Sequence, residues 1–192
     1  MLALANHVSP GRSAAYAVGA DFCRVFTQDM NSLYLLSFLL TADREKAEQC
    51  FASGLEDSVK SNRVFKEWAR SWARRTVIRN AIRMIEPTPG RAGEKTPFLT
   101  TDRGAYAKSE SEVSLAAVLA LGAFERFVFV LSVLERCSDQ ECSILLGCPQ
   151  RDVALARVRA AESLAGFVES NQAHAVGGTE MFAPERWLAE TA

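Results

Sequence analysis

A short segment rich in proline and glycine, residues 87–97, constrains the fold of this chain more than any other feature. It reads PTPGRAGEKTP, with three prolines and two glycines in eleven residues, and such a run cannot continue a helix. Both flanks have helical hydrophobic patterns. We therefore predict two helical domains joined by a linker: a first domain at 1–86, a linker at 87–110, a second domain at 111–170 and a C-terminal tail at 171–192.

The hydrophobic residues recur with helical spacing along most of the chain. No segment shows the sustained alternation, bounded by turn residues, that marks a strand. The expected helices span residues 13–27, 31–42, 44–58 and 63–86 before the linker, and 112–121, 124–136, 139–147 and 150–169 after it. The sequence therefore predicts an all-α fold, with a helical bundle in the first domain.

Four residues predict a helix-turn-helix in the second domain. Ser138 and Glu141 have the spacing of a capping box, in which each side chain satisfies the free backbone N–H of the other residue. Gly147 can take the left-handed conformation that ends a helix. Pro149 stands where the next helix would begin, and its missing N–H costs nothing there. Helix, tight turn and helix over 139–167 form a helix-turn-helix.

The small net charge of the chain conceals an uneven distribution. The chain has 22 basic and 23 acidic residues, a formal net charge of −1. Residues 60–95 carry a net charge of +7, whereas residues 1–59 carry −3 and residues 96–192 carry −5. A basic segment of this length can follow a polyanion.

Aromatic residues are interleaved with this charge between Arg63 and Arg83. On one helix the early basic residues would lie opposite Phe65, Trp68 and Trp72, whereas those after position 74 would lie near the aromatic side. We therefore expect a bend near 74–76, or two halves with different neighbours. We favour nucleic-acid backbone contact for the basic residues and the protein core for the aromatics. The alternatives are base stacking by the aromatics, a solvated arginine face, and a membrane-surface helix.

Several other classes of protein are disfavoured. The longest apolar run, Leu33–Leu40, is far shorter than the roughly 20 residues of a membrane-spanning helix. The first ten residues lack the pattern of a signal peptide. An odd number of cysteines, five, fits reduced thiols better than a disulfide framework. We therefore expect a cytoplasmic protein that does not bind membranes.

Catalytic and metal-binding patterns are also missing from the sequence. There is no glycine-rich phosphate loop, no paired-histidine motif, and no nucleophile with a plausible histidine base. The spacing of Cys137, Cys142 and Cys148 is wider than that of common zinc ligands. We expect no enzymatic activity, cofactor or metal, and we interpret these cysteines as buried hydrophobic residues, with redox sensing as the alternative.

Four segments together resemble the extracytoplasmic-function sigma factors of the sigma-70 family, which consist of two conserved regions, region 2 and region 4. In the first half these segments are 36–48, LSFLLTADREKAE, and 65–74, FKEWARSWAR. In the second half they are 125–131, ERFVFVL, and 137–147, CSDQECSILLG, followed by Val153 and Arg159-Ala160. The resemblance extends over about residues 21–167, and it depends on the order and spacing of the segments together.

The resemblance implies a transcription initiation protein that binds RNA polymerase core and promoter DNA, with an anti-sigma factor as a further partner. The family's first domain binds the polymerase clamp helices, and its basic aromatic helix recognises and opens the downstream promoter element. Its last helix enters the major groove of the upstream element. The implied DNA-binding residues are Lys66, Arg70, Arg74, Arg75, Arg79, Arg83, Gln150, Arg151, Arg157 and Arg159. The implied polymerase-binding residues are Asp43, Glu45, Glu48, Gln49 and Ala52.

Two departures from the family pattern favour alternatives. The polymerase-binding helix of the family usually has a run like DLVQE where this chain has QCFAS at 49–53. Ala154 and Ala156 stand where the recognition helix commonly has Lys and Arg, and residues 138–170 carry a net charge of −2. The first alternative is a diverged sigma-like adaptor that binds a protein partner without reading DNA. A second is a stand-alone helix-turn-helix regulator, dimeric on a palindromic site.

Overall fold

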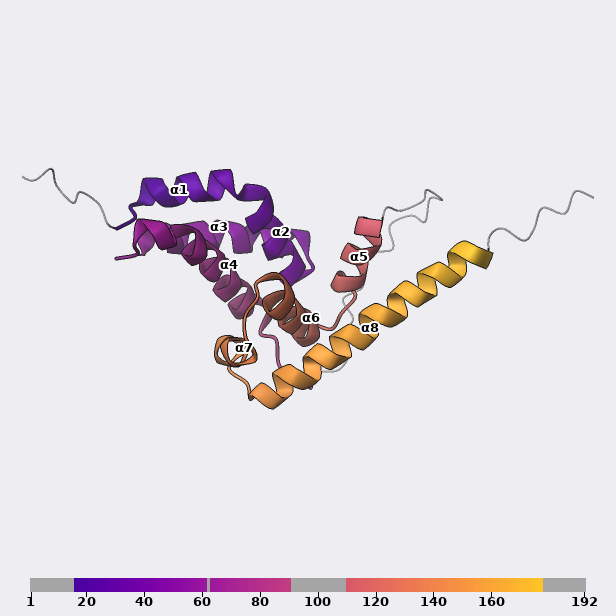
Figure 1. The fold of residues 1–192 in the computed structure, drawn as a ribbon. Coiled ribbons are helices and arrows are strands. Elements are labelled where there is room, and N and C mark those ends of the chain that lie inside the picture. The colour runs from indigo at the N-terminus through magenta and orange to yellow at the C-terminus, as the bar shows by residue number, and fades with distance from the viewer. Residues whose placement is uncertain (1–15, 62, 91–109, 178–192) are drawn as a thin grey trace, which may run out of the picture. The chain divides into compact units, whose positions relative to one another are not determined.

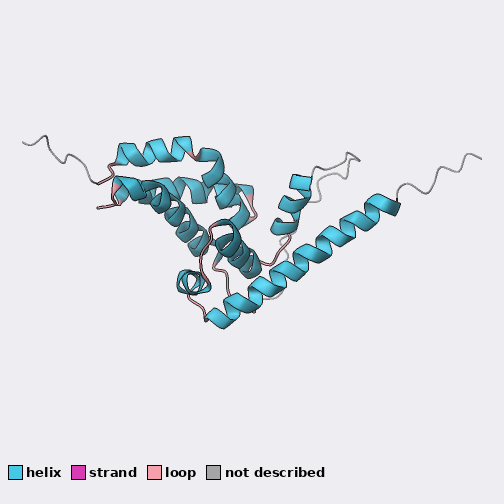
Figure 2. Cartoon of the chain, viewed as in Figure 1, coloured by secondary structure: helices cyan, strands magenta, loops and turns pink. Residues whose placement is uncertain are grey.

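The computed structural model describes residues 16–61, 63–90 and 110–177. These residues are helical almost throughout, and their only strand-like pairing is a single bridge between Tyr16 and Phe65. The predicted all-α fold is therefore confirmed (Figure 2). The chain divides into two compact units, Met1–Thr88 and Pro89–Ala192. The predicted domain boundaries stay a prediction, because most of the predicted linker lies outside the described residues.

The described residues of the first unit form four α-helices (Figure 1). They are α1 (Gly19–Gln28), α2 (Met30–Thr41), α3 (Arg44–Lys60) and α4 (Ala69–Ile85), and α4 is preceded by a 3₁₀ turn, η1 (Lys66–Trp68). The long helices α3 and α4 pack against each other, and α2 packs against both. The apolar positions that fill this bundle are Phe22, Phe26, Leu33, Leu36, Leu40, Ala47, Cys50, Ala73 and Val77.

Local signals explain where α2 ends and α3 begins. Ala42 takes the left-handed conformation with φ 52°, and its N–H donates to the carbonyl of Phe38 at the end of α2. Asp43 then caps α3, because its carboxylate accepts the backbone N–H of Lys46 at 2.9 Å. This bond satisfies one of the free N–H groups at the helix start.

A line of small and polar residues joins α3 to α4. The hydroxyls of Ser58 and Thr76 share a hydrogen bond of 2.8 Å, and Ser58 Oγ also donates to the carbonyl of Gly54 at 2.7 Å. The thiol of Cys50 donates to the carbonyl of Val77 at 3.3 Å. Each of these buried polar groups therefore has a partner, as buried polar groups require.

The predicted helix 63–86 is wrong at its start. Ala17 N–H donates to the carbonyl of Val64 at 2.6 Å, which holds this stretch extended, and Arg63 has φ 65°. The α-helix begins only at Ala69 and then runs without interruption to Ile85. Arg63 and Lys66 therefore do not share a helical face with the arginines that follow, and the irregularity lies before α4 rather than near 74–76.

The second unit contains α5 (Glu110–Leu119), α6 (Ala123–Phe129), α7 (Asp139–Leu146) and α8 (Gln150–Gly177). A π-helical turn, η2 (Val130–Leu134), follows α6 directly. The long helix α8 packs against α5, α6 and α7. It continues through residues that we predicted to belong to the tail, and the rest of that tail lies outside the described residues.

The core of the second unit forms between α6, η2 and α8. Its fully buried residues include Phe127, Leu131 and, from α8, Val153 and Ala160. Arg126 lies in this core with only 2% of its surface exposed, and its Nη1 donates to the carbonyl of Leu121 at 3.0 Å. Burial lowers the pKa of Arg126 to about 10, so it stays charged at neutral pH.

Within the described ranges, none of the helices combines the length and the hydropathy needed to pass through a lipid bilayer.

Candidate nucleic-acid interface

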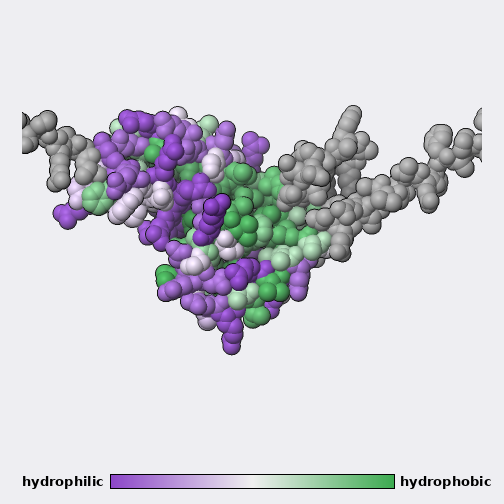
Figure 3. Space-filling view, in the orientation of Figure 1, coloured by the Kyte–Doolittle hydropathy of each residue, from purple (hydrophilic) through white to green (hydrophobic). Residues whose placement is uncertain are grey.

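Helix α4 carries the charge of the basic segment. Its sequence, ARSWARRTVIRNAIRMI, contains five arginines and no acidic residue. Its buried face holds Ala73, Val77 and Ala81, which pack into the bundle. The five arginines therefore lie at the sides of the helix and away from the core. Figure 3 shows hydrophilic side chains over the part of the first unit that contains α1.

Arg70 and Arg83 are paired with acidic residues from other parts of the first unit. Arg70 Nε lies 3.2 Å from the carboxylate of Asp29, and Arg83 Nη2 lies 2.6 Å from that of Asp57. Asn80 Nδ2 also donates to Asp57 at 3.0 Å. These hydrogen bonds, from Asn80 first and then Arg83, hold the pKa of Asp57 below its usual value. Arg70 and Arg83 are thus partly neutralised within the protein.

Lys66 also has an acidic neighbour. Its Nζ lies 3.6 Å from Asp21, whose carboxylate accepts the backbone N–H of Val18 at 3.1 Å. The bond from Val18, followed by the charges of Lys66 and Arg24, lowers the pKa of Asp21. Lys66 therefore stands beside the start of α1 as well as beside α4.

Arg75 and Arg79 remain available for an external anion. Both are exposed, and neither forms an ion pair with an acidic residue in the described ranges. The guanidinium of Arg79 lies 5.4 Å from the ring centre of Trp72, within the range of a cation–π contact. Arg74 is only partly exposed and donates to Ser32 Oγ at 3.0 Å.

The aromatic residues before α4 form a cluster at the surface. Phe65 stacks on Tyr16 with a ring-centre distance of 4.8 Å and meets the edge of Trp68 at 5.2 Å. Trp68 is 58% exposed, so our placement of it in the core is wrong. The physical reason is the 3₁₀ turn, which changes the direction of position 68 relative to an uninterrupted helix. Trp72 is half-buried, and its Nε1 donates to Ser61 Oγ at 2.8 Å.

Trp72, Arg75 and Arg79 lie along one side of α4, and the exposed Trp68 comes just before its first residue. The three residues of α4 lie within about 60° of one another at about 100° per residue, and Trp68 belongs to the 3₁₀ turn that directly precedes the helix. The guanidinium groups can neutralise phosphates, and an exposed indole can stack on a base. We call these four residues the α4 stripe, and its chemistry is suited to a nucleic-acid strand.

The predicted polymerase-binding residues lie at the start and along the outer face of α3. Asp43 has a structural task as the cap of this helix. Glu45, Glu48, Gln49 and Ala52 are all exposed, and their spacing of three or four residues places them on one face. Glu48 is paired with Arg44 at 3.4 Å. This face is free to meet another protein.

The helix-turn-helix geometry follows the sequence closely. Ser138 Oγ accepts the N–H of Glu141 at 3.2 Å, and a Glu141 carboxylate oxygen accepts the N–H of Ser138 at 2.8 Å, so the predicted capping box is confirmed. Gly147 has φ 64° and ends α7, as predicted. The carbonyl of Pro149 accepts the N–H of Asp152 at 3.0 Å at the start of α8.

The charged residues of α8 that we predicted to contact DNA are exposed but paired. Arg157 Nη1 lies 2.7 Å from Asp139, and Arg159 Nη1 lies 3.8 Å from Glu125. Arg151 lies 3.6 Å from its neighbour Asp152, although its side chain is 83% exposed. Gln150 is exposed at the first position of the helix. All three arginines of α8 therefore have acidic neighbours within the same unit, whereas only some of the arginines of α4 do.

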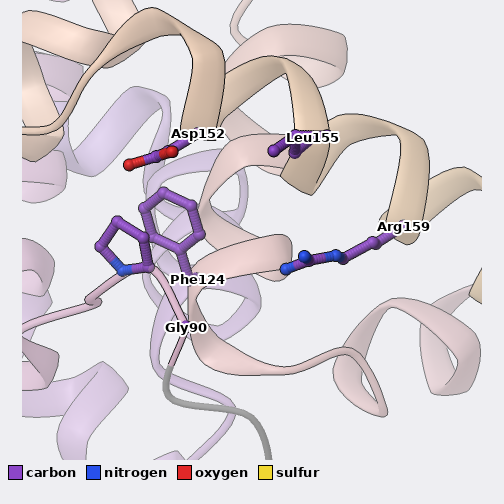
Figure 4. Close-up of a pocket in the computed structure, with 6 residues that line it drawn as sticks. Gly90, Phe124, Asp152, Leu155 and Arg159 are labelled. Atoms are coloured by element: carbon purple, nitrogen blue, oxygen red, sulfur yellow. The ribbon is translucent and has the colours of Figure 1, made fainter.

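A small pocket lies beside α8 in the second unit. It has a volume of about 200 Å³ and is lined by Pro89, Gly90, Phe124, Asp152, Leu155 and Arg159. Figure 4 shows Asp152, Leu155 and Arg159 at successive turns of α8 around the ring of Phe124. The two α8 side chains of opposite charge stand at its two ends, with apolar atoms between them.

Two of the three cysteines that we interpreted as buried hydrophobic residues are buried. Cys142 is fully buried and Cys148 is 9% exposed, which confirms them as buried residues, whereas Cys137 is only partly buried. Burial, with neighbouring Cys137 next, raises the pKa of Cys142 to about 12. A thiol with so high a pKa is protonated at neutral pH and reacts slowly.

Sequence reasoning missed two sets of residues. The first set comprises the acidic partners Asp29, Asp57, Asp139 and Glu125, which lie far along the chain from the arginines they meet. The second comprises exposed aliphatic residues on α8, Leu155 and Val158. A helical-wheel projection of residues 150–162 places the latter opposite the buried positions and so could have found them.

A comparison with models of known protein families finds none that matches this chain, and a comparison with curated proteins finds no match either.

Proposed function

We propose that the chain is a sigma-factor-like transcription initiation protein that binds RNA polymerase core and promoter DNA. Its role would be recruitment and base recognition, without chemistry of its own. The observation that carries the proposal is the α4 stripe, in which Arg75 and Arg79 form no ion pair within the described residues and lie on a helix without acidic residues, with the exposed Trp68 just before that helix. The exposed face of α3 and the helix-turn-helix of the second unit support it.

The α4 stripe would act on the DNA in two ways. Arg75 and Arg79 would contact successive phosphates, which releases condensed counterions and makes binding depend steeply on salt. Trp68 would stack on an unpaired base, a contact worth about 1–3 kcal/mol in comparable proteins. Lys66, Arg70, Arg74 and Arg83 would add to the field of this surface, reduced by the acidic partners described above.

A DNA-binding experiment tests the α4 stripe directly. The double variant Arg75→Ala with Arg79→Ala is compared with Arg24→Ala with Arg44→Ala, which removes the same charge from exposed ion pairs on α1 and α3. Affinity for forked promoter DNA is measured from low to moderate salt. We expect the first variant to bind more weakly and its log–log salt slope to fall by about 2, whereas the second keeps the slope of the wild type. Equal effects of the two variants would contradict the proposal.

Run-off transcription with RNA polymerase core tests the whole activity. The wild-type chain should form a complex with the core enzyme on gel filtration and start transcripts from a matching promoter. If no complex forms and no promoter is used, the proposal fails.

One observation favours the second candidate, an adaptor that binds a protein partner without reading DNA. All three arginines of α8 have acidic neighbours, and Ala156 is buried with 1% of its surface exposed, so this position faces the core. The adaptor predicts that a polymerase complex forms while Arg151→Ala with Arg157→Ala leaves DNA affinity unchanged. Loss of upstream-element binding in that variant would argue against it.

A further inference from the structure

The outward face of α8 carries a stripe of four side chains. Val153, Ala156 and Ala160 point into the core of the second unit. At about 100° per residue, the opposite side of the helix holds Arg151, Leu155, Val158 and Glu162. We call these the α8 stripe. Figure 3 shows hydrophobic side chains among hydrophilic ones over the N-terminal half of α8.

The α8 stripe leaves two branched aliphatic side chains in water. Leu155 is 49% exposed and Val158 is 54% exposed, and they are adjacent on the same side of the helix. Arg151 at one end is 83% exposed, and Glu162 at the other end is also exposed. Burying the two aliphatic groups against an apolar partner would be favourable, at about 25 cal/mol per Å² of apolar surface.

The side chains of the α8 stripe are complementary to those of a second copy when the two helices run antiparallel. Its order is basic, aliphatic, aliphatic and acidic, with spacings of four, three and four residues. In an antiparallel pair of α8 helices, Arg151 of one copy therefore faces Glu162 of the other, and Leu155 faces Val158. The spacing is also that of a seam between two coiled helices, in which hydrophobic positions alternate by four and three residues.

The flanks of the α8 stripe fit the same arrangement. On one side lie Asp152 and Arg159, which border the pocket at its two ends. In the antiparallel pair, Asp152 of one copy approaches Arg159 of the other, so opposite charges meet twice. On the other side lie Ala154 and Ala161, whose small side chains let two helices approach closely.

We propose that two copies of this chain associate through an antiparallel pairing of their α8 helices. Such an interface is isologous, because each contact occurs twice around a two-fold axis. Only two aliphatic residues per copy form its centre, so the dimer is weak and forms with a dissociation constant in the micromolar range or above. The pairing covers Arg151 and the face of α8 that a helix-turn-helix presents to DNA, unlike a dimer on palindromic DNA, which leaves that face open.

The test measures the molecular mass of the full-length chain in solution. Its result does not depend on whether the chain binds DNA or polymerase. Sedimentation equilibrium is run over about three decades of protein concentration. The wild type should change from monomer to dimer as the protein concentration rises. Arg151→Glu alone and Glu162→Arg alone should each stay monomeric, because like charges then face each other twice. An equal mixture of these two variants should form a dimer again, because every facing pair is then opposite in charge.

A control separates this geometry from a general effect of charge. Ser163→Arg adds a positive charge at an exposed position of α8 outside the stripe, and it should dimerise like the wild type. Circular dichroism confirms that all variants keep their helices. If the wild type is monomeric at every concentration, the proposal is wrong and the α8 stripe does not pair with a second copy. A mixture no more dimeric than its two components would overturn the antiparallel pairing.

Discussion

A methyl group on Gly54 would stand 2.8 Å from Cγ2 of Val77, so α3 and α4 lie closer together at this point than a larger residue would allow. Three hydrogen bonds accompany this approach, from Ser58 to the carbonyl of Gly54, between the hydroxyls of Thr76 and Ser58, and from Cys50 to the carbonyl of Val77. The helix that carries the candidate DNA-binding arginines is thus held against α3 by close backbone packing.

Gly54→Ala should destabilise the first unit, because the two helices must separate or Val77 must leave its rotamer. Overpacking of this kind costs about 1–3 kcal/mol. Urea denaturation followed by circular dichroism measures the loss. Gly166→Ala is the matched control, since a Cβ at this helical position meets nothing within 4 Å. It should be neutral or stabilising by up to about 1 kcal/mol; equal effects at both positions would refute close packing at Gly54.

Asp57 should make the stability of the first unit depend on pH in the acid range. Its pKa is lowered in the folded state by Asn80 and Arg83, so its contribution is present above the unfolded value of 3.8 and is lost as the pH falls through the lower folded value. Because 40% of the side chain is exposed, solvent screening keeps this contribution to about 1 kcal/mol or less.

The comparison of wild type with Asp57→Asn reveals this effect. The stability difference between them, measured by urea denaturation, should be present at pH 7 and should shrink as the pH falls below about 4. A difference that stays constant across this range would show that the carboxylate charge is not involved.

The two tryptophans at the start of α4 should differ in their access to solvent. Trp68 is 58% exposed, whereas Trp72 is half-buried and bonded to Ser61. Two variants with a single remaining tryptophan are compared, Trp72→Phe with Trp187→Phe, and Trp68→Phe with Trp187→Phe. Acrylamide should quench Trp68 fluorescence about two-fold or more efficiently than Trp72 fluorescence, since quenching requires collision with the exposed ring. Similar quenching would place position 68 inside the bundle.

The described cysteines should react with a thiol reagent at very different rates in the folded protein. Cys23 is exposed, whereas burial raises the pKa of Cys50 to about 11 and contributes most to the pKa of about 12 for Cys142. At neutral pH we expect Cys23 to be labelled quickly and Cys50 and Cys142 only after unfolding. Cys23→Ser should remove the fast phase of the reaction. Rapid labelling of Cys142, identified by peptide mass spectrometry, would contradict the buried position of this side chain.

The parts of the fold that sequence predicted well are those with a local cause. The capping box of Ser138 and Glu141 and the left-handed Gly147 each involve residues a few positions apart, so the pattern contains the whole explanation. The start of α4 could not be predicted in the same way. It depends on the bond from Ala17 to Val64, and residues so far apart along the chain give no local pattern.

The same distinction applies to the candidate site. The excess of arginine in α4 is visible in the sequence, and its solvent exposure follows from the helical spacing. The ion pairs that partly neutralise Arg70 and Arg83 come from Asp29 and Asp57, which lie far from them along the chain. The DNA-binding and polymerase-binding roles of the predicted residues stay predictions, and the structure adds that Arg75 and Arg79 are the ones to replace first.

The pairing of Ala17 with Val64 has a consequence for synthesis on the ribosome. Ala17 and Phe22 share a small core cluster with Val64 and Ala69, and Val25 and Trp72 pack against it. During translation, the start of α1 is made long before its apolar partners exist, and it stays without them until residues 64–72 have left the exit tunnel. This core cluster therefore forms late in synthesis. Until Val64 has been made, Phe22 lacks these partners and is exposed to chaperones.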